Sequence, residues 1–326
     1  MTTAQEVNDV AIVGAGPGGL ACAIEAKRHK LNYLVIEKGC LVNSVFHFPT
    51  NMTLFSTPEL LEIGNIPFII PTAKPTRTDL LGYYRRVAQH FELKINLSEK
   101  VQSISGKRGA FQIQTSGDKV YLAKNIVIAT GQYDTPSLMN IPGEEREKVS
   151  HYYTEAHPYY QKKVAIIGGK NSAVEAALDL YKHGVEVTII HRGEDFGKSV
   201  KYWILPDIKN RIKKGRIQAY FNTTVAEIKE DLLILTGDDG IETELENDFV
   251  FALTGYRPDM GFLRNMGVEF DPKLTPVHDE ETLQTNVPGI YIAGVITAGC
   301  EASKVFIENT RNHGTKIIGH INGTNV

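Results

Sequence analysis

A short apolar strand that runs straight into a glycine-rich turn occurs twice in this chain, and this repetition constrains the fold more than any other feature. The first copy passes from the strand 10–13 (VAIV) into the turn 14–19 (GAGPGG), and the second from 164–167 (VAII) into 168–173 (GGKNSA). A helical stretch and a second β-branched strand follow each turn, which is the order of a βαβ unit with buried parallel strands. The sequence therefore predicts an α/β protein with two Rossmann-like domains.

The first turn has the spacing of a dinucleotide-binding fingerprint. Gly14 allows the tight turn, Gly16 lets the backbone approach a pyrophosphate, and Gly19 lets the helix pack closely on the strand. The helix N-terminus supplies free N–H groups and a positive dipole for phosphates. Glu37 ends the next strand, where a carboxylate accepts hydrogen bonds from ribose hydroxyls. We expect a dinucleotide here; the alternative is a tight turn that holds no ligand.

The second turn differs from the first in its charges. Lys170 occupies the position of the second glycine, where a side chain either crowds the pyrophosphate or binds it directly. The following strand ends in His191 and Arg192 instead of a carboxylate, and cations attract the 2′-phosphate that a carboxylate repels. Lys198 and Lys201 follow and are expected to add positive charge. The second site is therefore predicted to bind NADPH.

Composition excludes several classes of protein. The net charge of −3 argues against a nucleic-acid binder, which needs an excess of Lys and Arg. Three cysteines form neither a disulfide framework nor a metal-ligand spacing. No signal peptide or membrane-spanning run is recognisable in the sequence. We expect a cytoplasmic protein without metal, membrane or nucleic-acid partners.

Apolar strands that end in glycine loops also indicate the domain boundaries. Such strands are expected at 125–131, 249–255 and 285–294, and the chain is predicted to cross between domains after the first two. The first domain is then discontinuous, with residues 1–131 and 258–326, and residues 132–257 form the second. A long helix is predicted from about Glu301 to about His320.

These features resemble the low-molecular-weight thioredoxin reductase type of flavoprotein, from Val10 to about His320. The resemblance is closer to the bacillithiol disulfide reductase (YpdA) group. It is carried by the segments 42–50 (VNSVFHFPT), 168–173 (GGKNSA), 203–206 (WILP) and 306–309 (FIEN). It implies FAD in the first domain, NADPH in the second, and a homodimer formed through the FAD domains.

The resemblance also implies cofactor contacts for individual residues. For FAD these are Gly14, Gly16, Pro17, Gly19, Glu37, Lys38, Asn43, His47, Thr50, Thr130, Gly131, Gly294 and Val295. For NADPH they are Gly168, Lys170, Asn171, Ser172, Ala173, His191, Arg192 and Lys198.

Three positions depart from the patterns of these flavoproteins. Segment 153–160 (YTEAHPYY) lacks the Cys-x-x-Cys pair of thioredoxin reductases, so a direct dithiol relay is excluded. Gly18 stands where the YpdA group typically has a cysteine, and Val295 stands where the wider class has an aspartate that holds the ribityl chain.

The remaining candidates for chemistry are a cysteine and several histidines. Cys300 follows the glycine loop 294–299, at the expected start of a helix that would favour its thiolate; the alternative is that it only caps the loop. Cys22 is expected to be a buried spacer, and Cys40 to lie near the adenosine half of FAD. His47, His151 and His157 are candidate proton donors or structural histidines. Tyr152, Tyr153, Tyr159 and Tyr160 either stack near the flavin or pack at a domain interface.

Three functions follow from this sequence. The leading one is an FAD-dependent NADPH oxidoreductase that acts on a low-molecular-weight thiol disulfide. The second is a ferredoxin or flavodoxin reductase, with part of the basic run 198–216 docking an acidic redox protein; that run is otherwise the solvated face of a helix. The third is a flavin-binding redox sensor.

Overall fold

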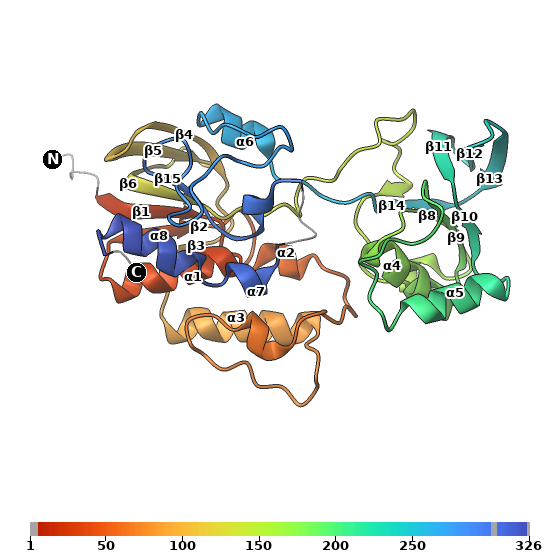
Figure 1. Ribbon diagram of the computed structural model, residues 1–326, viewed down its shortest axis with the longest axis horizontal. Helices are drawn as coiled ribbons and strands as arrows, with labels where there is room; N and C mark the ends of the chain where they lie inside the picture. Colours follow the sequence, from red (N-terminus) through yellow and green to blue (C-terminus); the bar gives the residue numbers. More distant parts are fainter. Residues whose placement is uncertain (1–5, 301–304, 325–326) are drawn as a thin grey trace. The chain divides into compact units, whose positions relative to one another are not determined.

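The computed structural model describes residues 6–300 and 305–324, and its chain forms two compact units. Unit 1 contains Met1–His47, Met52–Thr135 and Tyr256–Val326, and unit 2 contains Phe48–Asn51 and Pro136–Gly255 (Figure 1). The sequence placed the junctions after residues 131 and 257, a few positions from these divisions. The short segment Phe48–Asn51 joins unit 2 although its neighbours in sequence belong to unit 1.

Unit 1 is built on a seven-stranded sheet in the order β3-β2-β1-β6-β5-β4, with β15 also paired to β6. Strands β1, β2, β3, β6 and β15 run parallel, whereas β4 and β5 form an antiparallel extension beside β6. The strand bounds are β1 Val7–Val13, β2 Tyr33–Ile36, β3 Ile95–Asn96, β4 Val101–Lys107, β5 Ala110–Thr115, β6 Val120–Ile128 and β15 Ile290–Ile292.

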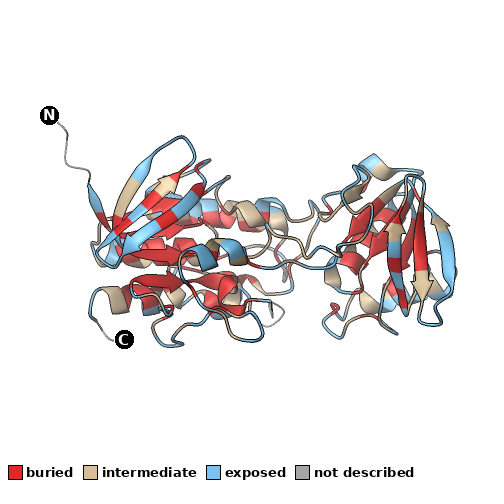
Figure 2. Ribbon diagram, turned by 90° about the horizontal axis from the view of Figure 1, so that it is seen from above, coloured by how far each residue is buried: buried red, intermediate tan, exposed pale blue. Residues whose placement is uncertain are grey.

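Both faces of this parallel sheet are covered. Val10 and Ile12 of β1 pack in one buried cluster with residues of α1 and α8, while Ala11 and Val13 pack in another beneath β4, β5 and α6. A strand that is buried on both faces has a continuous apolar sequence. This is why β1 could be predicted although apolar and polar residues do not alternate in it. Figure 2 shows this burial along the strands. The helices are α1 Pro17–Arg28, α2 Asn43–Phe46, α3 Arg77–His90, α6 Met260–Asn265, α7 Ile307–Thr310 and α8 His313–Ile321.

The single long helix predicted near the C-terminus is wrong. Residues 305–321 form two helices, α7 and α8, separated at Arg311 and Asn312, and residues 301–304 lie outside the described part. Asn309 Oδ1 accepts a hydrogen bond from the backbone N–H of Phe306, the N-cap residue, and this bond sets the beginning of α7 at Ile307. Asn and Thr side chains that bond to nearby backbone favour helix ends over helix interiors.

Unit 2 repeats the same core. Its parallel sheet has the order β10-β9-β8-β14-β7, so β8, β9, β10 and β14 take the places that β1, β2, β3 and β6 take in unit 1. A separate antiparallel sheet holds β11, β12 and β13. The strands are β7 Val149–Ser150, β8 Lys163–Ile167, β9 Glu186–Ile190, β10 Gln218–Tyr220, β11 Thr223–Ile228, β12 Leu232–Gly237, β13 Glu242–Glu246 and β14 Phe249–Ala252; the helices are α4 Asn171–Lys182 and α5 Leu205–Lys213. The described residues also contain the short 3₁₀ helices η1 Pro58–Leu61, η2 His157–Tyr159 and η3 Gly294–Ala298.

The fold class predicted from the repeated fingerprint, two Rossmann-like domains, is thus confirmed. No helix within the described residues is long and apolar enough to cross a membrane.

The close packing of α8 on α1 gives a stability prediction. A Cβ at Gly314 would lie 2.5 Å from the carbonyl oxygen of Ala21, whereas a Cβ at Gly82 in α3 would meet only the end of Arg86 at 3.9 Å. Gly314→Ala is expected to lower the free energy of unfolding by about 1–3 kcal/mol through overpacking. The matched Gly82→Ala should raise it by about 0.5–1 kcal/mol, since alanine is the better helix residue. Urea unfolding followed by circular dichroism measures both, and equal effects would contradict the packing argument.

Candidate functional site

The first glycine turn lies where β1 passes into α1, and its three fingerprint glycines meet different surroundings. A Cβ at Gly14 would lie 2.5 Å from the carbonyl oxygen of Ala129, and one at Gly19 would lie 1.9 Å from that of Gly14. A Cβ at Gly16 would meet nothing within 4 Å. Gly14 and Gly19 are therefore required by packing, while Gly16 faces open space in front of the turn.

The N-terminus of α1 faces this turn without a protein cap. Gly16 is the N-cap residue and Pro17 begins the helix, and no side-chain cap hydrogen bond is present at this end among residues 6–300 and 305–324. Backbone N–H groups at a helix N-terminus have no partner within the helix, and together with the dipole they favour an anion.

Glu37 lies at the end of β2, beside the same turn. Its carboxylate is buried and accepts hydrogen bonds from the N–H of Ala15 at 2.8 Å and from that of Gly39 at 2.9 Å. These bonds use about two of the four acceptor positions of a carboxylate. Glu37 therefore holds the turn and keeps capacity for further donors.

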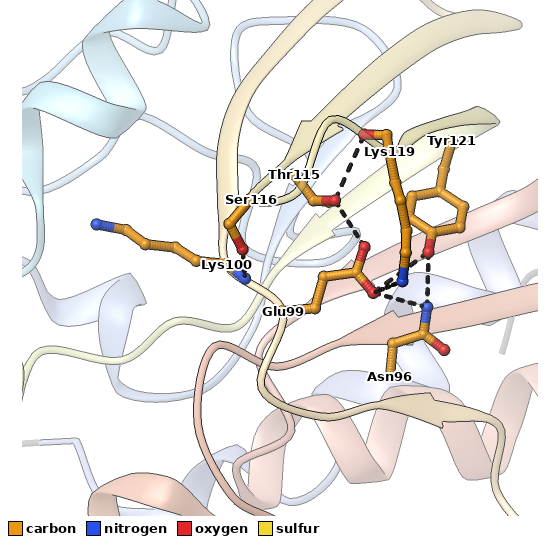
Figure 3. A network of polar contacts seen from close by, with 7 residues as sticks. All are labelled: Asn96, Glu99, Lys100, Thr115, Ser116, Lys119 and Tyr121. Atoms are coloured by element: carbon orange, nitrogen blue, oxygen red, sulfur yellow. Dashed lines mark hydrogen bonds and ion pairs between the residues drawn. The ribbon is translucent and has the colours of Figure 1, made fainter.

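A polar network supports the loop behind Glu37 (Figure 3). The backbone N–H of Glu99 donates to the carbonyl of Glu37 at 2.9 Å. The buried carboxylate of Glu99 accepts from Thr115, Asn96, Tyr121 and Lys119, at 2.6, 3.1, 3.2 and 3.4 Å. Burial works to raise the pKa of Glu99, but hydrogen bonds from Thr115 and Tyr121 and the charge of Lys119 outweigh it and hold that pKa below its usual value.

Segments distant in sequence converge on this edge of the sheet. A Cβ at Gly18 would lie 3.1 Å from the Cα of Gly294, and a Cβ at Gly131 would lie 3.9 Å from Val295 Cγ2. Thr130 and Gly131 follow β6, and Gly294 follows β15, which pairs with β6. The structure thus brings the first turn, Thr130, Gly131, Gly294 and Val295 together.

The contact at Gly18 explains the missing side chain there. A Cβ at this position would require the Gly294 backbone to shift by a few tenths of an ångström. A cysteine at position 18 would require this small shift of the backbone.

Gln132 is a site residue that the sequence analysis did not select. Its Oε1 atom is buried and has no hydrogen-bond partner within the described residues. Buried polar atoms are nearly always paired, so an orphaned acceptor next to Gly131 indicates a position that a ligand donor can fill. The only signal in the sequence was its place directly after the Ala-Thr-Gly loop.

The chain after β2 carries four further residues that were predicted to bind FAD, and each of them has different surroundings in the structure. Lys38 forms an ion pair with Asp134 at 2.9 Å, and Asn43 opens the short helix α2. His47 is exposed, its Nδ1 lying 2.8 Å from the carbonyl of Asn43. Thr50 belongs to the segment that clusters with unit 2, and its N–H donates to the carbonyl of Thr154.

The second glycine turn repeats the backbone geometry of the first. A Cβ at Gly168 would lie 2.7 Å from the carbonyl oxygen of Leu253, the counterpart of the contact between Gly14 and Ala129. The N–H of Gly168 donates to the carbonyl of Ile190, as that of Gly14 does to Ile36. Lys170 is the N-cap residue of α4, which begins with Asn171, Ser172 and Ala173 and has no side-chain cap.

His191 packs against this turn. A Cβ at Gly169 would lie 2.5 Å from three atoms of the His191 ring. Burial, and then the adjacent charge of Arg192, lower the pKa of His191. His191 therefore fills space beside Gly169 and is a weaker cation than the sequence suggested.

Three cationic side chains at this edge have no ion pair or hydrogen bond within the described part of the chain: those of Lys170, Arg192 and Lys198. All three are exposed, and Lys170 Cγ would lie 3.3 Å from a Cβ at Gly197, next to Lys198. The added charge expected from Lys201 is wrong, because its ammonium group is buried against the carboxylate of Glu175. Asn171 holds the same loop by bonding Ser199 and the N–H of Lys201 at 2.8 Å each.

Two cations of the basic run that follows are paired with carboxylates, whereas Lys213, Lys214 and Arg216 are exposed. Lys209 pairs with Asp195 at 2.6 Å, and Arg211 pairs with Asp207 at 3.0 Å across one turn of α5.

Two of the four tyrosines pack in the core of unit 2. Tyr153 contacts Phe251 edge-on, and Tyr159 contacts both Phe249 and Phe251. Tyr160 is exposed. Of the candidate histidines in this region, His157 begins η2 and is exposed, whereas His151 Nδ1 lies 3.2 Å from the carbonyl of Ala252.

The three cysteines have distinct surroundings. Cys22 is fully buried in α1, and burial raises the pKa of its thiol to about 12, so the expected spacer role is confirmed. Cys40 is exposed, and its Sγ lies 3.6 Å from Asn43 Oδ1. Cys300 is exposed directly after η3 and Gly299. The helix expected to start at residue 301 falls outside the described residues there.

Comparison with known proteins agrees with this arrangement. Residues 11–294 match the family model described as pyridine nucleotide-disulphide oxidoreductase. The chain is 44% identical to "Bacilliredoxin reductase Bdr" of Bacillus subtilis, over 95% of this chain and 96% of that protein. Bacillithiol disulfide reductase Bdr (YpdA) from Bacillus cereus superposes with a TM-score of 0.95 at 45% identity, over 98% of this chain and 99% of that one.

A more distant solved structure supports the same fold. Thioredoxin reductase of T. acidophilum gives a TM-score of 0.78 at 26% identity, over 98% of this chain and 99% of that one. The resemblance stated from the sequence is therefore confirmed: this chain belongs to the pyridine nucleotide-disulphide oxidoreductase family, and it is a reductase with the thioredoxin reductase-like fold.

Proposed function

We propose that this chain is an FAD-dependent NADPH oxidoreductase that reduces a low-molecular-weight thiol disulfide. Unit 1 binds FAD and unit 2 binds NADPH. The observation that carries the proposal is the open space in front of Gly16, at an uncapped helix N-terminus that is flanked by glycines with no space of their own. The net reaction consumes NADPH, one proton and a disulfide, and yields NADP⁺ and two thiols.

The residues of unit 1 fit FAD. Gly16 and the N-terminus of α1 receive the pyrophosphate, and Glu37 has acceptor capacity for ribose hydroxyls. The orphaned Gln132 Oε1 offers an acceptor to a ligand donor. FAD, when bound, supplies a ring that takes a hydride from a nicotinamide and delivers electrons to an acceptor.

The cations of unit 2 fit NADPH. Arg192, at the end of β9 where a 2′-phosphate is bound, and Lys198 in the following loop are exposed and have no carboxylate partner among the described residues. Lys170 replaces the glycine that approaches a pyrophosphate and supplies a charge there. Burial makes His191 a packing group more than a charged contact.

The thiol disulfide as acceptor rests on the relatives. Two proteins at 44% and 45% identity are named as a bacilliredoxin reductase and a bacillithiol disulfide reductase, and both match this chain over almost its full length. A disulfide is therefore favoured over a ferredoxin or flavodoxin.

A substitution at Gly16 tests the FAD site. Gly16 has φ −73°, so a larger residue is compatible with the backbone and changes only the space in front of the turn. Purified Gly16→Val is expected to be colourless and folded, with wild-type circular dichroism, while the wild type is yellow. Full flavin content in the variant, measured from visible absorbance after denaturation, would refute the assignment.

Removal of Arg192 tests the choice of coenzyme. A hydrogen bond between charged groups contributes about 1.5–3 kcal/mol, so Arg192→Ala should raise the KM for NADPH by about tenfold or more. The KM for NADH should change little, because NADH has no 2′-phosphate. Lys209→Ala is the matched control, since that lysine is already paired with Asp195. Equal losses with both coenzymes would show that Arg192 is structural.

Cys300 is proposed to take part in disulfide reduction, as the exposed thiol that follows the Gly294 turn. Cys300→Ser should lose most NADPH-dependent turnover of bacillithiol disulfide and keep reduction of ferricyanide. Cys40→Ser, the other exposed cysteine, should keep both activities. Unchanged disulfide turnover in Cys300→Ser removes this thiol from the mechanism.

The electron acceptor is tested on the wild-type protein after reduction with NADPH under anaerobic conditions. If ferredoxin reoxidises the reduced flavin faster than any disulfide does, the proposed acceptor is overturned. If NADPH does not bleach the flavin at all, a redox sensor is favoured.

A further inference from the structure

His313 is the first residue of α8, and its side chain reaches the turn that follows β15. The backbone N–H of Gly294 donates a hydrogen bond to His313 Nδ1 at 3.2 Å. The carbonyl of Gly294 accepts a second bond from Thr297 Oγ1 at 2.9 Å. Gly294 has φ +81°, which is a left-handed backbone conformation. Side chains therefore bond both the N–H and the carbonyl of this left-handed residue.

The ring of His313 acts here as a neutral acceptor. A nitrogen that accepts the Gly294 N–H carries no proton of its own, so the ring proton is on Nε2. Burial, and then the charges of Lys316 and His278, lower the pKa of His313 to about 4. The side chain therefore contributes a fixed acceptor and no charge to this region.

The backbone around His313 fixes where that acceptor lies. Gly314 approaches Ala21 so closely that a Cβ would come within 2.5 Å of its carbonyl oxygen. Helix α8 thus lies directly on α1, the helix that begins at the fingerprint turn, as Figure 1 shows. At the start of α1, Gly18 packs on the same Gly294 that His313 holds. Three segments distant in sequence meet around one peptide group.

We propose that His313 is a positioning residue for the FAD site: by accepting the Gly294 N–H it fixes the turn 293–298 against the N-terminus of α1. The side chain of Val295 carries no polar group. The buried hydroxyl of Thr297 already donates its proton to the carbonyl of Gly294, so the donors that this turn can still offer are backbone N–H groups. Holding the Gly294 peptide determines how that backbone faces the space beside Gly131. His313 contacts the turn and acts through it. This inference rests on the proposed binding of FAD by unit 1.

The test compares two replacements of His313 in the full-length protein. His313→Phe keeps a ring of similar size and removes the acceptor. His313→Asn places a carbonyl oxygen at about the position of Nδ1 and restores the acceptor without the ring. The control is His320→Phe, at the far end of α8, where the ring contacts Tyr291. Apoprotein of each is titrated with FAD, followed by flavin fluorescence, and its thermal midpoint is recorded without FAD.

The expected result is a dissociation constant for FAD raised about tenfold or more in His313→Phe. His313→Asn should return to within about threefold of the wild type, and His320→Phe should match it. If His313→Phe does not fold, His313→Asn still decides: weak binding by a folded His313→Asn protein contradicts the acceptor role.

Other outcomes separate this inference from the proposed function. Equally tight FAD binding by the wild type and His313→Phe overturns only the role of His313. A wild-type protein that binds no FAD overturns the cofactor and the role together. In ¹⁵N-histidine NMR spectra of the apoprotein, His313 should have an unprotonated Nδ1; a proton there would exclude the hydrogen bond independently of FAD.

Discussion

The close approach of backbone to backbone at the carboxyl edge of each parallel sheet is the constraint on which the rest of the structure depends. In unit 1, Gly19 lies against Gly14, and Gly14 lies against Ala129, at distances that leave no space for a side chain. In unit 2, Gly168 meets Leu253 in the same way. These contacts let each helix begin directly above the sheet, with its free N–H groups facing the turn. Gly16 differs from these glycines because a Cβ there would meet no atom within 4 Å. This open space is where the pyrophosphate is proposed to bind.

The two units use the same backbone with opposite charges. In unit 1 the second strand leads to Glu37, whose buried carboxylate bonds the turn and is backed by the network around Glu99. In unit 2 the matching strand leads to His191 and Arg192, while Glu175 and Asp195 are paired with Lys201 and Lys209. Among the described residues at this edge of the sheet, the side chains of Lys170, Arg192 and Lys198 therefore remain unpaired. A common fold with different side chains at one strand end supports the proposal that the two units bind different dinucleotides.

Much of this arrangement could be predicted from residues close together in the sequence. The strand-turn-helix order predicted β1, α1 and β2, and again β8, α4 and β9, because buried parallel strands read as apolar runs and glycine turns have fixed spacing. The residues proposed to bind the two pyrophosphates belong to these same local patterns. The predicted helix from Glu301 to His320 was wrong, because apolar periodicity alone indicated neither the bond by which Asn309 caps the beginning of α7 nor the separation of α7 from α8.

The sequence by itself determined the two Rossmann-like domains, the glycine turns and the sign of the charge at the end of each second strand, because these depend on spacing and residue type within one βαβ unit. Only the tertiary structure decided which charges remain free and which backbone groups meet. The sequence predicted the same role for Lys198 and Lys201, but Lys201 is buried against Glu175 and Lys198 is exposed. Gly18, Gly294 and His313 come together through the pairing of β15 with β6 and the packing of α8 on α1. Contacts between segments almost 300 residues apart follow from the fold as a whole, and no local pattern specifies them.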